Sequence, residues 1–527
     1  MNERIDETET LAQSAQPKLY DILIIGAGLS GIFAAYEIAK QRPDLKIALL
    51  EQGRAVKDRV CPIVSGKVKQ CISCPICAIM RGFGGAGAFS DGKFNFTTEF
   101  GGWLTDYLPE EEVLSLIDEV DKLNQEMGAK KEFHSTYSEA ANEIRRKALG
   151  VDMHLLNACC KHLGTDQNRE ILLRMNQWLA EHIDLICECE VFEIQARYKG
   201  QKVVLDHEPK NEAWEDLKER LGESDAQQEQ LPHNNCARHQ DFPEGRPQVD
   251  AYHLFTSRGE FVSSKLIAAP GRAGAEWFSG QCRNLGLKLL NNQVDIGVRV
   301  ELPALVFKEI TDAVYEAKLK YQTKCYRDIV RTFCMNPYGY VVAENTDGII
   351  TVNGHSYEDP ALASENTNFA LLVSNRFTEP FNEPYKYGKA IASLSNMLGG
   401  GVLVQRLGDL LDGRRSTFHR MQKSFVKPTL DATPGDLSLV LPRRQLEDIM
   451  EMLMVLDKIA PGTANSDTLL YGVEVKFYSA RLELSKNFET HLPGFYAIGD
   501  GAGITRGLSQ AAASGLHAAR ALLKRMN

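Results

Sequence analysis

The chain has 527 residues, 43% hydrophobic and 25% charged, and these proportions exclude a fibre or a disordered chain. Its length predicts two or three substructures, and its formal net charge of −10 argues against a nucleic-acid-binding surface. The polar N-terminal stretch predicts no signal peptide, and no apolar run is long enough to predict a membrane span. We therefore expect a cytoplasmic protein.

The first predicted element is a strand, because Ile22 to Ile25 form a short, apolar, β-branched run. A glycine turn and a helix from about Ser30 to Lys40 follow, and Pro43 prevents the helix from continuing. A second apolar run, from Lys46 to Leu50, completes a predicted βαβ unit.

Further along the chain the spacing of apolar residues alternates between helical and extended. Residues 99–185 repeat apolar positions every three or four residues and predict a helical insertion. From Cys187 the spacing of apolar residues shifts towards every second residue, which predicts a meander of strands. Residues 207–248 are polar and predict a mobile surface insertion that interrupts this meander. Residues 291–380 are strand-rich, helical patterns return near 385–411 and 442–459, and the C-terminus reads as strand, glycine turn and long helix.

The motif "GAGLSG" lies between the first strand and its helix and predicts a dinucleotide site. Gly26 allows the tight turn, Gly28 lets a pyrophosphate approach the backbone, and Gly31 permits close helix–strand packing. Glu51 ends the second strand, where its carboxylate can accept hydrogen bonds from ribose hydroxyls. Because the strand, helix and acidic residue are all in place, we interpret this motif as more than a glycine-rich loop.

The C-terminal motif "YAIGDGAG" resembles the ending of flavoproteins with two dinucleotide-binding domains, and this resemblance favours FAD over NAD. It implies that Gly499, Asp500 and Gly501 lie beside FAD, with Asp500 holding a ribityl or pyrophosphate-side hydroxyl. It also implies that the final helix, from about Leu508, faces the isoalloxazine ring. The alternative is that Asp500 only caps a helix or turn.

Several motifs together resemble the bacterial and archaeal family of uncharacterised FAD-dependent dehydrogenases, from about residue 20 to the end without the 207–248 insertion. They are "GFGGAGAFSDGKF", "HLGTD", "VDIGVRVE", "RTFCMNP", "VNGHS" and "GDGAG". The resemblance implies a second glycine turn beside the FAD pyrophosphate, followed by residues that pass near the flavin. The turn would use Gly84, Gly85 and Gly87, and Ser90, Asp91 and Lys93 would follow it. A capped turn is the alternative for Ser90 and Asp91.

Only one complete GxGxxG motif is present, so a separate nicotinamide-binding domain is not expected. Electrons would then come from a partner protein or from transiently bound NAD(P)H.

Cys61, Cys71, Cys74 and Cys77 precede the second glycine turn and have four possible roles. The two-residue gaps resemble ferredoxin-like ligation of a [4Fe–4S] cluster with a remote fourth ligand, which would give the flavin a one-electron neighbour. Zinc is a second possibility, a redox dithiol is a third, and reduced structural thiols are a fourth. Disulfides are not expected in a reducing compartment.

Four further residues are candidates for contact with the substrate. Cys334 lies in "RTFCMNP", His355 in "VNGHS", Arg299 in "VDIGVRVE" and Glu474 in "GVEVKF". Reduction at a flavin needs a proton donor and a nearby cation, which His355 and Arg299 would supply. His355, Arg299 and Glu474 are equally compatible with satisfied polar residues in a sheet, and the alternative for Cys334 is a buried thiol. The pair Cys159 and Cys160 lies on a helical pattern and is expected in a core.

The sequence therefore predicts an α/β fold with a Rossmann-like FAD-binding domain, a parallel sheet plus a β-meander. This domain would comprise residues 18–98, 186–290 and 462–527, and a mixed α+β substrate domain would comprise residues 291–461. The expected function is FAD-dependent two-electron oxidation or reduction of a small or apolar substrate. Alternatives are a geranylgeranyl-reductase-like reductase of C=C bonds and a non-enzymic flavin redox sensor or electron carrier.

Overall fold

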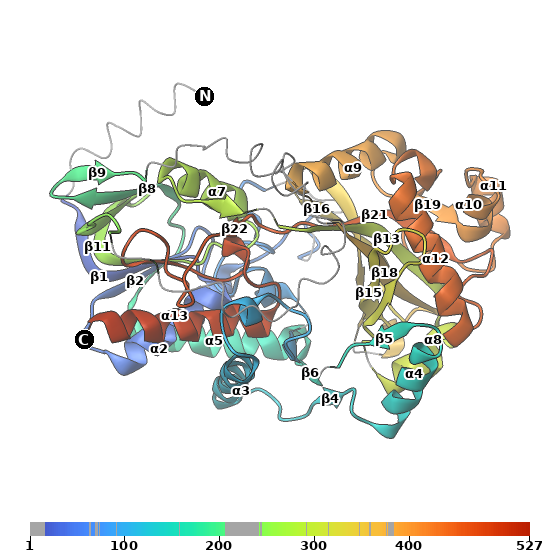
Figure 1. Cartoon of the computed structure of the whole chain (residues 1–527), viewed down its shortest axis with the longest axis horizontal. Coiled ribbons are helices and arrows are strands. Elements are labelled where there is room, and N and C mark those ends of the chain that lie inside the picture. Colours follow the sequence, from blue (N-terminus) through green and yellow to red (C-terminus); the bar gives the residue numbers. More distant parts are fainter. Residues whose placement is uncertain are drawn as a thin grey trace, which may run out of the picture. The chain divides into compact units, whose positions relative to one another are not determined.

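The computed structural model describes most of the chain, in two compact units (Figure 1). Unit 1 comprises Met1–Phe133, Cys160–Leu290 and Ser479–Asn527, and unit 2 comprises His134–Cys159 and Asn291–Tyr478. The described residues are 16–526 except 63–64, 69–71, 73, 91, 158, 206–241, 243–244, 291, 315, 347, 358–359, 376 and 378–383. The predicted insertion at 207–248 lies almost entirely outside the described residues.

A parallel sheet extended by an antiparallel meander forms the centre of unit 1. Its order is β7-β2-β1-β11-β10-β8-β9, and β23 also pairs with β11. The pairs β7–β2, β2–β1, β1–β11 and β11–β23 are parallel, whereas β10 and β8 run antiparallel to their neighbours. The strands are β1 (Lys18–Ile25), β2 (Ile47–Leu50), β7 (Asp184–Ile186), β8 (Val191–Tyr198), β9 (Gln201–Val203), β10 (Ala251–Thr256), β11 (Gly259–Ala268) and β23 (Phe495–Ala497). This arrangement confirms the predicted Rossmann-like fold with a β-meander.

Helices of unit 1 lie along the sheet, with α2, α5 and α13 on one side of it in Figure 1. The first and last helices pack closely, since a methyl group on Gly515 would lie 2.2 Å from the Ser30 carbonyl oxygen. The helices are α2 (Leu29–Gln41), α3 (Glu110–Glu126), α5 (Gly164–His182), α7 (Ala275–Asn284) and α13 (Leu508–Met526). Short elements are η1 (Val56–Asp58), η2 (Gly85–Phe89), β3 (Lys93–Phe96), η3 (Leu104–Asp106), β6 (Cys159–His162), β12 (Leu289–Leu290), β22 (Arg481–Leu482) and η8 (Asp500–Ala502).

A mixed, largely antiparallel sheet in the order β20-β19-β21-β13-β18-β15-β14-β5 forms unit 2. Its strands are β5 (Met153–Leu155), β13 (Val294–Pro303), β14 (Leu319–Gln322), β15 (Ile329–Asn336), β18 (Asn366–Asn375), β19 (Leu403–Arg406), β20 (Thr433–Pro434) and β21 (Leu469–Lys476). Separate from it are β4 (His134–Ser135) and the hairpin β16 (Tyr340–Thr346) and β17 (Ile349–His355). Helical elements are α4 (Glu139–Leu149), α8 (Ala304–Ala313), η6 (Pro360–Leu362), α9 (Pro384–Gly399), α10 (Leu407–Leu411), α11 (Phe418–Lys423), η7 (Leu437–Leu439) and α12 (Arg443–Ile459).

The two faces of this sheet differ in chemistry, because successive side chains of a strand point to opposite faces. On β13, Ile296, Val298 and Val300 belong to the hydrophobic core that also contains side chains of α12. The alternating residues Asp295 and Arg299 therefore point to the other face, although both are buried. Unit 2 thus has one apolar and one charged sheet face.

Two features differ from the sequence expectation. Cys159 and Cys160 lie on strand β6, not on a helix, because this short segment pairs with β3. The division into units also assigns 134–159 and 462–478 to unit 2, since β5 and β21 pair within its sheet. Among the described residues, no helix has the length and apolar character needed to cross a membrane.

Candidate functional site

The first glycine motif forms a tight turn in which two positions exclude any side chain. A methyl group on Gly26 would lie 2.2 Å from the Ala269 carbonyl oxygen, and Gly26 has a φ of +95°. A methyl group on Gly31 would lie 1.9 Å from the Gly26 carbonyl oxygen. These two glycines therefore hold the start of α2 against the ends of β1 and β11.

Gly28, between them, has a different environment. It is the N-cap of α2 and has no side-chain cap, and a methyl group there would meet nothing within 4 Å. The first N–H groups of a helix have no partner inside the helix and attract anions. The turn therefore combines open space with backbone donors, as a pyrophosphate requires.

Glu51 connects three backbone segments of unit 1. Its carboxylate accepts hydrogen bonds from the backbone N–H groups of Ala27, Gly53 and Gly82, each at 2.8 Å. The side chain is buried, so these bonds replace water around the charge. A carboxylate offers about four acceptor positions, which leaves about one for a ribose hydroxyl.

The second glycine turn lies directly beside the first. The Gly84 N–H donates to the Ala27 carbonyl at 2.7 Å, and a methyl group on Gly85 would lie 3.3 Å from the Gly28 Cα. The Ser90 hydroxyl donates to the Gly87 carbonyl at 2.7 Å, so it closes the turn locally. Asp91 lies outside the described residues.

The C-terminal glycine turn reaches the same helix end from a third direction. A methyl group on Gly499 would lie 2.1 Å from the Ser30 hydroxyl oxygen of α2, and one on Gly501 would lie 2.5 Å from the Pro270 ring. Asp500 accepts hydrogen bonds from the Arg272 Nε at 3.1 Å and from the Thr505 hydroxyl at 2.6 Å. Three segments far apart in the sequence therefore surround the N-terminus of α2.

The cysteine-rich segment is attached to this glycine cluster through Arg59. The buried Arg59 guanidinium donates to the backbone carbonyls of Ala78, Ile79 and Phe83 at 2.7 to 2.9 Å. Burial lowers the pKa of Arg59 to about 10. Arg59 thus ties the end of the cysteine segment to the second glycine turn.

Cys61, Cys74 and Cys77 are all half-buried, whereas Cys71 lies outside the described residues. Within the part of the chain that the structure describes, no three His, Cys, Asp or Glu side chains form a group that could hold a metal ion. The predicted cluster, with Cys71 as one ligand, therefore stays a prediction.

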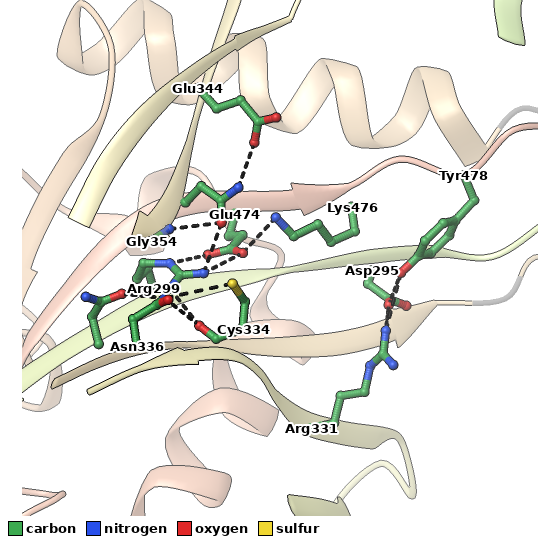
Figure 2. A network of polar contacts seen from close by, with 12 residues as sticks. Asp295, Arg299, Arg331, Cys334, Asn336, Glu344, Gly354, Glu474, Lys476 and Tyr478 are labelled. Atoms are coloured by element: carbon green, nitrogen blue, oxygen red, sulfur yellow. Dashed lines mark hydrogen bonds and ion pairs between the residues drawn. The ribbon is translucent and has the colours of Figure 1, made fainter. Parts of the chain in front are cut away.

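Unit 2 brings together three of the four candidate substrate-contact residues (Figure 2). Arg299 and Glu474 form a two-bond ion pair at 2.8 and 3.0 Å, with both side chains fully buried. Burial opposes both charges, but Glu474 raises the pKa of Arg299, and Arg299 together with Lys476 lowers that of Glu474. Both residues are therefore charged at neutral pH.

The remaining donors of Arg299 bind other strands of the sheet and the hairpin. Its Nη1 donates to the Cys334 carbonyl at 3.1 Å and to the Asn368 amide oxygen at 2.8 Å, and its Nη2 donates to the Asn353 amide oxygen at 3.3 Å. With the two bonds to Glu474, all five N–H groups of the guanidinium have protein acceptors. Arg299 therefore fixes Cys334 and the hairpin rather than offering a donor to a substrate.

The other two candidates lie at the edge of this network. Cys334 is half-buried with a φ of +45°, an uncommon conformation for a residue with a side chain, and its sulfur contacts the Asn336 amide. His355 is exposed at the end of β17, with its ring 4.7 Å from that of Tyr357. Its neighbour Gly354 packs on Arg299, since a methyl group there would lie 2.1 Å from Nη1.

Sequence reasoning missed a second polar group on the same sheet face. Arg331 and Tyr478 both donate to the Asp295 carboxylate (Figure 2), and Lys476 donates to Glu474 at 2.9 Å. The sequence did contain a sign of this polar group. Asp295 and Arg299 are four residues apart on one predicted strand, so their side chains share a face of the sheet. Their partners come from distant strands, which no local pattern identifies.

Family models match two separate parts of the chain. Residues 293–477 match the family described as FAD-dependent protein, C-terminal domain-like, and residues 8–57 match the Thi4 family. An uncharacterized protein of Clostridium beijerinckii is 31% identical over 222 residues, covering 40% of this chain and 40% of that protein. Thiamine thiazole synthase of Yarrowia lipolytica is 63% identical over 35 residues, covering 7% of this chain and 11% of that protein. The match thus spans less than half the length of either relative.

Glycine oxidase from Geobacillus kaustophilus is a similar solved structure, with 12% identity over 96% of this chain and 95% of that one and a TM-score of 0.35. A likeness this weak does not inform the function. The family match to residues 293–477 covers most of unit 2. Through these residues, the chain is similar to FAD-dependent proteins.

Proposed function

We propose that the protein is an FAD-dependent oxidoreductase that carries out two-electron chemistry on a small or apolar substrate. The observation that carries this proposal is the meeting of three glycine-rich segments and Glu51 at the N-terminus of α2. The space above Gly28 fits a pyrophosphate, and Glu51 has acceptor capacity left for a ribose hydroxyl. The family match of residues 293–477 favours FAD over NAD.

The proposed FAD site uses all three glycine turns. Gly26, Gly28 and Gly31 would hold the pyrophosphate with Gly84, Gly85 and Gly87. Gly499 and Gly501 would bring Asp500 to a ribityl or pyrophosphate-side hydroxyl, since each of its two oxygens accepts one hydrogen bond from a described residue and can accept another. Ser90 and Asp91 would lie near the flavin. FAD, when bound, would accept or donate two electrons with accompanying protons.

In unit 2 we propose two kinds of role for the polar residues. Cys334 and His355 would contact the substrate, because their side chains are not fully buried. Arg299 and Glu474 would position them, because every N–H group of Arg299 already has an acceptor. An Arg299→Lys variant that binds FAD normally but alters both KM and kcat would support a positioning role.

A finer part of the proposal is an iron–sulfur relay at Cys61, Cys71, Cys74 and Cys77. Its support is the ligand spacing and the attachment of this segment to the glycine cluster through Arg59. Zinc, a redox dithiol and structural thiols remain alternatives for these cysteines. Electrons would otherwise come from a partner protein or NAD(P)H.

An anaerobic absorption spectrum of the purified protein, with iron, sulfide and zinc assays, tests these proposals. We expect flavin bands and about one FAD released per chain; protein that neither carries nor regains FAD would contradict the proposed function. Iron and acid-labile sulfide would support the relay, and their absence from anaerobically purified protein would overturn it. Bleaching of the flavin by NADPH alone would identify the electron donor.

Two alternatives have their own readouts on the same sample. Reoxidation of the reduced protein by geranylgeranyl diphosphate would favour a C=C reductase. A flavin that is reduced reversibly, yet is reoxidised by no small molecule and changes the binding of a partner protein, would favour a sensor or electron carrier.

A further inference from the structure

We propose that Arg331, Phe333 and Lys476 of unit 2 bind the carboxylate of a small organic acid with an apolar or aromatic body. This inference rests on the proposed function and specifies its substrate class. Arg331 and Phe333 are two apart on β15 and so point to one face of the sheet, the charged one. Lys476 ends β21 and directs its ammonium group to Glu474 on that face (Figure 2).

Arg331 uses only part of its hydrogen-bonding capacity. Its Nη2 donates to the Asp295 carboxylate and, at 3.3 Å, to the Tyr478 hydroxyl. Its Nε is buried and has no hydrogen-bond partner among the described residues. A buried donor without an acceptor is destabilising, because it has lost its water without gaining a partner. The Arg331 guanidinium therefore has donor capacity left for a ligand. Arg299 has none, because all five of its N–H groups are bound.

Three cations surround the Phe333 ring. The Lys318 Nζ lies 4.7 Å from the ring centroid, the Arg331 Cζ 5.3 Å and the Lys476 Nζ 5.9 Å. The ring is half-buried, so it presents apolar surface between these charges. An aromatic face next to fixed cations suits a ligand with an apolar body and a negative end.

Each cation near the ring has a carboxylate beside it. Asp295 pairs with Arg331 and Glu316 pairs with Lys318, whereas Glu474 is shared between Lys476 and the fully buried Arg299. Lys476 therefore shares its counter-charge with a second cation. In a partly buried site, the attraction of these cations for an added anion is stronger than in water.

The geometry favours a carboxylate over other anions. A guanidinium is a planar fork that matches the two oxygens of a carboxylate or phosphate, and the apolar surface of Phe333 favours an anion with an apolar body. Asp295 is the internal competitor, since its carboxylate occupies Nη2. Removal of its charge should therefore strengthen the binding of an external carboxylate.

Isothermal titration calorimetry of the flavin-loaded protein with sodium benzoate tests this site, with benzamide as the uncharged analogue. We expect wild-type protein to bind benzoate at least tenfold more tightly than benzamide. Arg331→Met should weaken benzoate binding about tenfold to a hundredfold, as expected for loss of a charge-assisted hydrogen bond. Asp295→Asn should strengthen it several-fold.

Matched variants keep this test falsifiable. Arg443→Met removes a guanidinium that is 86% exposed on α12 and should leave benzoate binding unchanged. Arg331→Lys keeps the charge without the fork, and an intermediate loss is expected even if Arg331→Met fails to fold. Phe333→Leu should weaken benzoate binding without strengthening that of inorganic phosphate.

Four results would overturn the proposal: no benzoate binding by wild-type protein, equal binding of benzamide, binding unchanged in both Arg331 variants, or phosphate binding as tight as that of benzoate. The flavin spectrum of each sample reports FAD content separately. Protein without FAD would contradict the proposed function, while calorimetry on the same sample would still decide the carboxylate site.

Discussion

In unit 1 the candidate site is made of backbone, whereas in unit 2 it is made of side chains. The three glycine turns around α2 present N–H groups and empty space, and the Glu51 carboxylate binds backbone N–H groups of the first two turns. On the sheet face of unit 2, arginines, lysines, carboxylates and amides from four strands meet. The first kind of site suits a constant group such as a pyrophosphate, and the second suits a substrate that differs between relatives.

The largest effect is expected at Gly31, where the backbone site of unit 1 has no spare room. A methyl group there would lie 1.9 Å from the Gly26 carbonyl oxygen, so Gly31→Ala should destabilise unit 1 by more than about 4 kcal/mol. Soluble expression and FAD content should both be lost. Stable, flavin-loaded Gly31→Ala protein would show that the turn tolerates a side chain and would break the contrast between the units.

The next effect is expected in the side-chain site of unit 2. Glu474→Gln leaves the fully buried Arg299 without its counter-charge and should cost about 3–5 kcal/mol in the free energy of unfolding. Glu309→Gln, in an exposed ion pair with Lys147, should cost about 1 kcal/mol or less. Urea unfolding of both variants measures the difference, and equal losses would mean that the buried pair has no special role.

The same pair gives a pH dependence with a defined sign. The pKa of Glu474 in the folded chain lies below its ordinary value of 4.5, so its stabilising contribution is present above pH 4.5. It is lost as the pH falls below that value through the folded pKa. The stability of wild-type protein should therefore drop more steeply in this acid range than that of Glu474→Gln, and parallel curves would contradict the assignment.

A smaller effect is expected at Glu51, which connects the backbone segments of unit 1. Glu51→Gln replaces one acceptor oxygen with an NH2 group facing N–H donors and should cost about 1–3 kcal/mol. FAD affinity should fall in the same variant, whereas Glu190→Gln, which alters an exposed bond to Gln52, should leave it unchanged. Full FAD affinity in Glu51→Gln would separate this residue from the cofactor site.

The smallest effect concerns Asp448, a carboxylate of α12 whose burial, together with nearby Asp328, raises its pKa to about 7. A folded pKa above the ordinary value of 3.8 means that stability falls as the pH rises towards 7. Asp448→Asn should therefore stabilise the protein by on the order of 1 kcal/mol at pH 8 and by less at pH 5. A gain of equal size at both pH values would exclude this titration.

The sequence predicted the βαβ unit that carries the unit 1 site because its signals are local. Gly26, Gly28, Gly31 and Glu51 belong to one βαβ unit, and each acts through backbone geometry that residue type alone indicates. The meeting of the three glycine turns came from a family resemblance, since no spacing rule joins Gly85 to Gly499. Three strands were missed within 134–162, because segments of two to four residues carry no measurable period.

The unit 2 site was predicted only in part. Arg299, Glu474 and Cys334 were chosen separately for their chemistry, and the structure brings them into one network. All donors of Arg299 are bound, while the Arg331 Nε has no partner in the part of the chain that the structure describes, and this difference depends on which side chains meet across the sheet. Such pairings are set by strand order and register, which no local pattern contains.

The most direct test of an FAD site in unit 1 is a fluorescence titration of deflavinated protein with FAD, comparing wild type, Gly28→Val and Gly280→Ala. Both glycines have no atom within 4 Å of an added methyl group, so neither substitution should disturb the fold. We predict that Gly28→Val folds normally but binds FAD at least about a hundredfold more weakly, because its side chain fills the space of the pyrophosphate. Gly280→Ala, on α7, should bind like wild type. Unchanged FAD affinity in folded Gly28→Val would contradict the assignment of this turn to the cofactor.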